Sequence, residues 1–240
     1  MTQQPIVILC AMITEAQVIL DALNLAQSPT PWPNSYPPRC WSGQINNHPI
    51  HLIANGRDPA TNAELIGTTP ATLATTLTIQ HLNPKAILIA GAAGGCSKST
   101  NIGDVLLIDK AFHHDRRIPL PEFNPYAHGP ESLHASPQLA SAFKAQLANI
   151  STGNALDTLE HELEFFTTNQ VTVKDMETAS IAWAASLTQT PTLALRAITD
   201  HYDHPTPEHQ FLANFQHALT NLAKSVTAGL PALIEEFTDR

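Results

Sequence analysis

The stretch that decides the fold is AILIAG at residues 86–91. It is apolar at every position and does not alternate with polar residues, so it indicates a strand that helices bury on both faces. Other short, mainly apolar runs are predicted strands, at residues 5–10, 50–56, 104–109 and 192–198. Segments with helical spacing of apolar residues lie between several of them. Strands that alternate with helices predict an α/β fold with a central, largely parallel sheet.

The predicted helices occupy residues 14–25, 136–150, 176–187 and 207–237. Thr14 is the N-cap candidate of the first, and Ser136 followed by Pro137 is typical of a helix start. The third is apolar on most sides, so we expect it to be buried. The last would be a long C-terminal helix, with Gly229 and Pro231 marking the place where it would break.

The length and composition predict one compact domain. With 240 residues, the chain can bury the core of a single α/β domain and needs no second one. Two proline-rich segments, at 27–39 and 116–132, are predicted loops. No repeat, linker or low-complexity segment is visible, so residues 1–240 are expected to form a single domain.

The composition also argues against several classes of partner. The formal net charge is −9, whereas nucleic acids and anionic membranes are bound through clustered Lys and Arg, so we expect neither as a partner. Cys10, Cys40 and Cys96 lie far apart without CxxC spacing, which disfavours a disulfide framework. The start, MTQQPIVILCAMITEAQ, resembles neither a signal peptide nor a membrane span. The expected location is the cytoplasm.

In α/β sheets, ligands bind where the loops at the carboxyl ends of the strands converge. AGAAGGC at 90–96 follows a predicted strand and could be a tight turn or a cradle for a ligand, although it lacks the dinucleotide and P-loop spacings. Glu15, Asp175 and Glu177 fall near helix starts, where acids compensate the helix dipole. Glu177, however, has small and apolar neighbours that predict burial, and a buried carboxylate needs partners such as sugar hydroxyls.

Acids and histidines cluster after the last predicted strand. The segment LALRAITDHYDHPT at 193–206 contains Arg196 and then Asp200, His201, Asp203 and His204. Three interpretations are open: a metal site, a solvated turn, or the catalytic edge of an enzyme. A metal site is disfavoured because no remote ligand motif is visible, and HELEF at 161–165 is not HExxH. We expect no metal.

Glu15, Glu177 and Asp200 follow different strands or precede different helices, and together with the small-residue segment they suggest one pocket. Such a set suits hydrolysis at an anomeric carbon, in which one carboxyl group protonates the leaving group and another activates water.

Five motifs now identify a resemblance: AMITEA, AGAAGG, NIGDVLLID, KDMETASIA and LRAITD. Their order resembles that of the nucleoside phosphorylase superfamily from about residue 5 to residue 235, and most closely its 5'-methylthioadenosine/S-adenosylhomocysteine nucleosidase branch. GRDPA, HDRRIPLPEF and STGNALD are similar to the plant-type methylthioadenosine nucleosidases. The resemblance implies a three-layer α/β/α fold with a central mixed, partly barrel-like sheet, and a homodimer. It also implies that water cleaves the N-glycosidic bond of 5'-methylthioadenosine without a cofactor, with S-adenosylhomocysteine as a further candidate substrate.

The resemblance also implies roles for individual residues. Asp200 would donate a proton to purine N7, which requires its pKa to be raised above the usual value of about 3.9. Glu177 would bind the ribose hydroxyls, Glu15 would polarise the attacking water, and Arg196 would lie in the same polar network. The remaining implied substrate contacts are Met12 and Met176 on the ribose and base, the backbone of Ala93, Gly94, Leu156 and Asp157 around adenine, and Thr199 behind the acid.

Three positions depart from the pattern of the relatives. Asn154 replaces an Asp, Ala92 replaces a Ser or Thr, and Leu156 replaces the aromatic residue of the bacterial enzymes. Three other functions stay open: an aminodeoxyfutalosine hydrolase, a purine nucleoside phosphorylase, and a nucleoside-binding or storage protein without activity. A phosphorylase needs an anion site, and the first strand ends here in AMITEA rather than in a Gly-rich turn, which favours hydrolysis.

Overall fold

The computed structural model of the protein describes residues 3–238 and contains one mixed sheet across that range. The order of the strands in the sheet is β10-β6-β8-β9-β5-β1-β4-β3-β2, and β7 pairs with β6. The strands are β1 (Ile6–Cys10), β2 (Ala26–Ser28), β3 (Arg39–Ile45), β4 (His48–Ala54), β5 (Ala86–Gly95), β6 (Val105–His113), β7 (Glu131–Ser132), β8 (Gln146–Thr152), β9 (Val171–Asp175) and β10 (Thr192–His201).

Part of the sheet closes on itself. Strand β10 pairs in parallel with β5 and antiparallel with β6, so that β5, β10, β6, β8 and β9 form a closed barrel of five strands. Strands β1, β4, β3 and β2 extend the sheet beyond β5 as an open wing. The prediction of a mixed, partly barrel-like sheet is confirmed.

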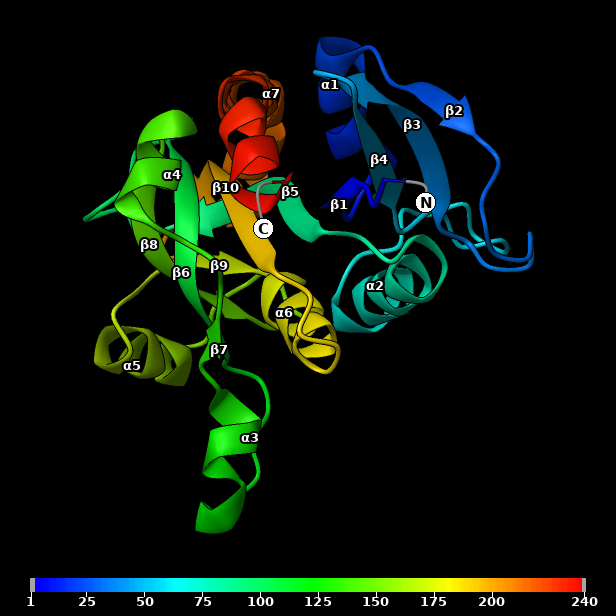
Figure 1. Ribbon diagram of the computed structural model, residues 1–240. Coiled ribbons are helices and arrows are strands. Elements are labelled where there is room, and N and C mark those ends of the chain that lie inside the picture. Colours follow the sequence, from blue (N-terminus) through cyan, green and yellow to red (C-terminus); the bar gives the residue numbers. More distant parts are fainter. Residues whose placement is uncertain (1–2, 239–240) are drawn as a thin grey trace.

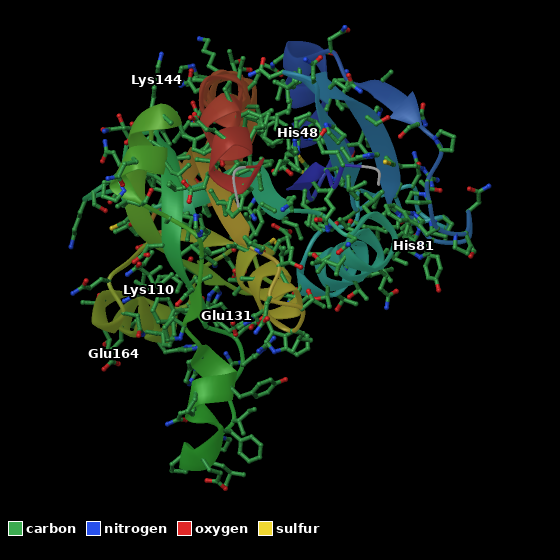
Figure 2. All side chains as sticks on the ribbon, viewed as in Figure 1. His48, His81, Lys110, Glu131, Lys144 and Glu164 are labelled. Atoms are coloured by element: carbon green, nitrogen blue, oxygen red, sulfur yellow. The ribbon has the colours of Figure 1, made fainter. Side chains whose placement is uncertain are left out.

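Helices cover both faces of this sheet (Figure 1). On one face, α1 (Ile13–Leu23), α4 (Pro137–Ala142) and α7 (Pro207–Thr238) enclose an apolar core with β1, β4, β5 and β10. On the other face, α2 (Thr68–Leu82) and α6 (Thr178–Ser186) pack together over a second core. The remaining helices are the 3-10 turn η1 (Pro121–Phe123), α3 (Asn124–His128) and α5 (Glu160–Thr168). The predicted α/β/α layers are therefore confirmed, and Figure 2 shows side chains filling the space between them.

All five strands predicted from apolar runs are present. Strand β5 is longer than expected, because AGAAGG continues the strand to Gly95 and pairs with β10 along its whole length. Of the two interpretations left open for that segment, the tight turn is therefore wrong, whereas Ala92, Ala93 and Gly94 do line the cavity described below. Backbone hydrogen bonds to β10 stabilise this extension, although its residues have little strand propensity of their own.

The prediction of one helix over 136–150 is half right. Ser136 Oγ accepts a hydrogen bond from the backbone N–H of Leu139 at 3.1 Å, and Pro137 is the first helical residue, as expected. The helix ends at Ala142, however, and Lys144 adopts a left-handed backbone conformation with φ 53°. The following residues form β8 between β6 and β9, because pairing with two strands outweighs their local helical pattern.

Two details of helix boundaries were also wrong. Thr14 is not the N-cap of α1: the helix begins at Ile13, and the Glu15 carboxylate, rather than a Thr hydroxyl, accepts the backbone N–H of Met12 at 3.0 Å. Helix α7 does not break at Gly229 or Pro231. The buried apolar face that it shares with the sheet continues past both residues, and this packing outweighs the backbone hydrogen bond lost at proline.

The described helices also bear on the question of membrane insertion. None of those between residues 3 and 238 combines the length and the apolar character needed to cross a bilayer.

Replacing Gly229 with Ala should destabilise the fold, because the added methyl group would overlap the ring of buried Phe143. Overpacking of this kind costs about 1–3 kcal/mol, and the gain in helix propensity offsets about 1 kcal/mol of it. We therefore expect a lower urea midpoint for Gly229→Ala. Adding Phe143→Leu should recover part of the loss. An unchanged midpoint in the single variant would show that α7 and Phe143 can move apart at little cost in stability.

Candidate active site

A cavity of about 250 Å³ lies where β1, β5, β9 and β10 end. Its walls are mainly apolar, with acidic groups and one lysine among them. The lining residues are Ala11, Met12, Glu15, Ile66, Ala92, Ala93, Gly94, Leu156, Lys174, Asp175, Met176, Glu177, Thr199, Asp200 and Phe211.

Most of the predicted site residues line this cavity. They are Met12, Glu15, Ala93, Gly94, Leu156, Met176, Glu177, Thr199 and Asp200. Two predicted contacts lie outside its wall. Arg196 is buried behind it with 1% of its surface exposed, and Asp157 is exposed on the loop after β8, where its carbonyl accepts a hydrogen bond from Lys174.

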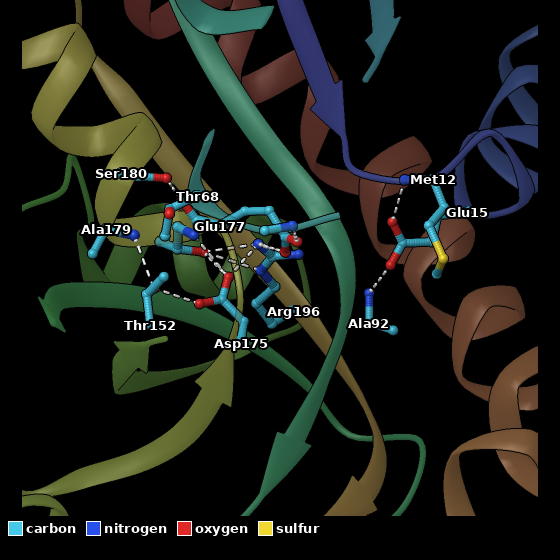
Figure 3. Close-up of polar contacts among 12 residues, drawn as sticks. Met12, Glu15, Thr68, Ala92, Thr152, Asp175, Glu177, Ala179, Ser180 and Arg196 are labelled. Carbon is cyan, nitrogen blue, oxygen red and sulfur yellow. Dashed lines mark hydrogen bonds and ion pairs between the residues drawn. The ribbon is translucent and has the colours of Figure 1, made fainter. Parts of the chain in front are cut away.

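Glu15 is held in place by backbone amides. Its carboxylate accepts the N–H of Met12 at 3.0 Å and the N–H of Ala92 at 2.8 Å, so it connects the start of α1 to β5 (Figure 3). Burial raises the pKa of Glu15, while the charge of Arg196 and these two hydrogen bonds oppose the shift. A buried carboxylate of raised pKa at a cavity wall can accept a proton from water.

Glu177 directly precedes α6 and faces the cavity. Its Oε1 accepts the backbone N–H of Gly67 at 2.9 Å, and its Oε2 lies 3.6 Å from the Arg196 guanidinium. Burial raises the pKa of Glu177 to about 7. The charges of Asp175 and Glu15 act in the same direction, and Arg196 opposes them only in part. A carboxylate with spare acceptor capacity in such a place is suited to hydroxyl groups of a ligand.

Arg196 and Asp175 form a buried ion pair beneath Glu177 (Figure 3). Arg196 Nε also donates to Thr178 Oγ1 at 3.1 Å, and Asp175 accepts the hydroxyl of Thr152 at 2.5 Å. These contacts join β10 to β9, β8 and the start of α6 across the barrel. They leave the guanidinium committed to protein partners rather than to the cavity.

Asp200 lies at the end of β10 on the opposite wall. Its Oδ1 accepts the hydroxyl of Thr199 at 2.7 Å, and the side chain is 3% exposed. Burial raises the pKa of Asp200, and the Thr199 hydrogen bond, His201 and Lys174 oppose this. A carboxyl group of raised pKa in an apolar cavity can remain protonated at higher pH than a free aspartate and donate that proton.

Two glycines of β5 give these carboxyl groups room. A Cβ at Gly91 would lie 2.5 Å from the Arg196 guanidinium and 2.9 Å from Glu15 Oε1, and a Cβ at Gly94 would lie 2.9 Å from Asp200 Oδ2. The small residues of AGAAGG therefore permit close approach of acidic side chains to the strand, as well as lining the cavity.

A buried lysine holds the loop that carries Leu156. Lys174 Nζ donates to the carbonyls of Leu156, at 3.3 Å, and of Asp157, and to Thr158 Oγ1 at 3.0 Å. Glu162 lies 4.0 Å away and caps the start of α5 by accepting the N–H of Leu159 at 2.9 Å. Burial lowers the pKa of Lys174, and Glu162 foremost among the nearby acids counteracts this. Lys174 thus holds the loop by three hydrogen bonds, and Glu162 compensates its buried charge.

Two of the three departures from related sequences, Asn154 and Ala92, have structural roles. The Asn154 side chain accepts the N–H of Thr68 at 2.9 Å and donates to Asp115 at 3.1 Å, so it ties the loop after β8 to the start of α2. Ala92 acts through its backbone N–H, which binds Glu15. Neither position places a side-chain hydroxyl or carboxylate in the cavity.

The histidine and aspartate cluster after Asp200 forms a turn. Asp203 accepts the backbone N–H and the hydroxyl of Ser97, and His204 bonds to Thr206. His201 contacts the carbonyl of Thr100 at 3.1 Å. Within residues 3–238, no group of three or more His, Cys, Asp or Glu side chains is arranged to hold a metal ion.

The sequence analysis assigned no part in the site to several residues of the wall: Ala11, Ile66, Lys174, Asp175 and Phe211. A signal existed for Lys174, because a lysine within the apolar run VTVKD needs a buried partner. Ile66 and Phe211 come from a loop and from the first turns of α7, and nothing in their local sequence indicates that they meet.

The sequence is similar to that of one protein superfamily and of several enzymes within it. A family model described as the phosphorylase superfamily matches residues 5–231. An Arabidopsis thaliana 5'-methylthioadenosine/S-adenosylhomocysteine nucleosidase is 34% identical over 226 residues, covering 92% of this chain and 89% of the relative. A 5'-methylthioadenosine nucleosidase from the same plant is 35% identical over 213 residues, covering 87% and 79%.

A solved structure shows the same architecture. The apo structure of Arabidopsis thaliana 5'-methylthioadenosine nucleosidase superposes with a TM-score of 0.91 at 31% identity. The match covers 100% of this chain and 98% of that one.

Replacing Asp175 with Asn should destabilise the protein by about 3–5 kcal/mol, because it removes one partner of a buried ion pair and leaves Arg196 undercompensated. Arg57→Gln is the matched control, since it removes a more exposed ion pair with Glu64 that should be worth at most about 1 kcal/mol. Urea unfolding followed by circular dichroism measures both. Equal losses would show that the buried pair contributes no more than the exposed one.

Proposed function

The chain belongs to the phosphorylase superfamily, and from this premise we propose that it is an N-glycosidase that hydrolyses 5'-methylthioadenosine and also S-adenosylhomocysteine. The observation that carries the proposal is the convergence of Glu15, Glu177 and Asp200 on one small, mainly apolar cavity. Of the two Arabidopsis thaliana relatives, which are 34% and 35% identical over the aligned residues, one is named for both substrates and the other for 5'-methylthioadenosine alone.

In the proposed reaction, the bond between C1' of the ribose and N9 of adenine breaks, and its electron pair stays with the base. Asp200 donates its proton to N7, which makes adenine a better leaving group. Water adds to C1' of the oxocarbenium-like sugar, and its proton passes to Glu15. The products are adenine and the 5-thioribose derivative, and no cofactor takes part.

The remaining lining residues would hold the substrate. Glu177 would accept the ribose 2'- and 3'-hydroxyls, and Met12 and Met176 would pack on the ribose and base. The adenine would lie against the backbone of Ala93 and Gly94, under the loop that Lys174 holds. The carbonyl of Asp157 is bound by Lys174, so we propose that this residue acts by shaping the loop.

The electrostatics support a division of labour between acid and base. Burial raises the pKa of both Asp200 and Glu15. Asp200 has a single hydroxyl donor, from Thr199, whereas Glu15 accepts two backbone N–H groups that favour its charged form. Different surroundings thus favour a protonated Asp200 and an ionised Glu15.

The charges around the cavity favour water over phosphate as the nucleophile. Among its lining residues, Lys174 is the one basic side chain, and it is bound to the loop after β8. Arg196 is paired with Asp175 and Glu177. A phosphate ion would therefore meet four carboxyl groups, those of Glu15, Asp175, Glu177 and Asp200, and no uncommitted cation, which disfavours phosphorolysis.

We further propose that the protein is a cytoplasmic homodimer in which the whole chain forms one domain, and that it acts in methionine salvage. The segment from 116 to 130, including α3, projects from the body of the molecule (Figure 1). It exposes Leu120, Phe123 and Tyr126. Apolar residues on a projecting segment are typical of a surface that packs against another chain.

The first test is release of adenine from 5'-methylthioadenosine in phosphate-free buffer. We expect turnover that phosphate does not increase, with Asp200→Asn lowering kcat by about 10²–10⁴-fold because it removes the proton donor. Asp203→Asn is the matched control, since Asp203 lies on the exposed turn three positions later, and it should retain kcat. Turnover only with phosphate would identify a phosphorylase instead, and binding without turnover would identify a nucleoside-binding protein.

The pH profile tests the role of Asp200 through its neighbour. Thr199→Val removes the hydroxyl donor to Asp200 Oδ1, so the pKa of Asp200 should rise. A hydrogen bond of about 1 kcal/mol corresponds to roughly 0.7 of a pKa unit. Since the acid must be protonated to act, activity is lost above its pKa, and the alkaline limb of kcat should move to higher pH. A limb that stays in place would show that another group is the proton donor.

A further inference from the structure

A second cavity, of about 340 Å³, lies beside the first. Unlike the first, it is lined largely by polar and charged side chains. The lining residues are Ile13, Asn34, Ser35, Tyr36, Pro37, Arg39, Arg57, Asp58, Pro59 and Asn62. They come from the start of α1, from the proline-rich loop before β3, and from the loop after β4.

Two short segments connect the cavities. Met12 lines the first cavity and Ile13, the next residue, lines the second. Ile66 lines the first, and Glu64, two residues earlier, binds Arg57 of the second at 2.7 Å. The same Glu64 carboxylate accepts the N–H of Ile13 at 2.7 Å, so the two segments are joined side by side. Residues that are neighbours in the chain thus line the two cavities.

The charged groups of the second cavity differ in how far they are engaged. Arg57 is bound to Glu64 and to the carbonyl of Asn62. Asp58 Oδ1 accepts N–H groups and a hydroxyl of its own loop. Arg39 is exposed at the start of β3, and its side chain makes no hydrogen bond or ion pair with any residue between 3 and 238.

We propose that this second cavity binds the amino-acid end of S-adenosylhomocysteine, with Arg39 recognising the carboxylate. The inference rests on the proposed function and extends it to the 5' substituent. Arginine presents a planar set of donors that fits a carboxylate in two parallel hydrogen bonds. The carboxylate of Asp58, which lines the same cavity, suits the α-ammonium group of the same zwitterion.

The route of the 5' substituent follows from the proposed placement of the ribose. With Met12 on the ribose, the 5' substituent would leave the first cavity near Met12 and Ile66. Ile66 is 47% exposed, so this part of the cavity wall lies at the surface of the chain. A methylthio group ends at this point and gains nothing from Arg39, whereas a homocysteinyl group continues toward it. The second cavity therefore discriminates between the two substrates.

The test compares the binding of both nucleosides to the Asp200→Asn variant, which should hold them uncleaved. Calorimetry gives the Kd of S-adenosylhomocysteine and of 5'-methylthioadenosine, each with and without Arg39→Gln. The lost contact in Arg39→Gln is a charge-assisted pair at a partly solvated site. We therefore expect the Kd of S-adenosylhomocysteine, divided by the Kd of 5'-methylthioadenosine, to rise about tenfold. Arg39→Lys keeps the charge but not the planar donor set, so its Kd ratio should lie between that of Arg39→Gln and that of the protein with Arg39 intact.

Lys144→Gln is the control, since Lys144 is an exposed cation on the turn after α4 (Figure 2) and lines neither cavity. It should leave the Kd ratio unchanged. An unchanged ratio in Arg39→Gln, or a parallel loss of both ligands, would overturn the role of Arg39.

Turnover separates this inference from the proposed function. Hydrolysis of 5'-methylthioadenosine by the unmodified protein, together with a Kd ratio that ignores Arg39, would overturn only the amino-acid site. Absence of hydrolysis of either nucleoside would overturn the proposed function, and the Kd ratio would still decide whether Arg39 recognises the carboxylate.

Discussion

The structure depends on one buried cation. Arg196 lies inside the barrel, where its guanidinium binds Asp175, approaches Glu177 and donates to Thr178. Strand β10, which carries Arg196, is not paired with β9, which carries Asp175, so this contact crosses the barrel instead of following its ladder. Removing either partner would leave a charge in a region without water. The ion pair therefore fixes the position of β10, the strand that closes the barrel, relative to Asp175 and Glu177.

The same cation sets the chemistry of the cavity. Its charge opposes the effect of burial on Glu15 and on Glu177, yet the pKa of both stays raised because burial is the larger effect in each case. Asp200 lies beyond this network and responds mainly to its own burial. One guanidinium and one apolar wall thus produce three acids with different tendencies to hold a proton. That is the arrangement that cleavage of a glycosidic bond by acid and base requires.

The two cavities divide recognition from chemistry. The first cavity is mainly apolar and holds the reacting groups, while the second is polar and carries Arg39, whose side chain has no polar partner among residues 3–238. Apolar walls raise the pKa of carboxyl groups, whereas a solvated cation can select a charged substituent without disturbing them. Glu64 joins segments that line the two, so a hydrogen bond and an ion pair hold these segments together.

The sequence by itself determined the apolar strands, the α/β class and the acids that follow them, because burial on two faces and helix starts leave local patterns. It also indicated that Glu177 would be buried, from its small neighbours. It did not reveal that residues 146–152 form a strand, that AGAAGG extends β5, or that Lys174 and Phe211 line the cavity. Only the tertiary structure decided these points. Strand pairing, the Arg196 ion pair and the cavity that Arg39 and Ile13 both line bring together segments far apart in the chain, and such arrangements leave no periodicity in the sequence of either segment.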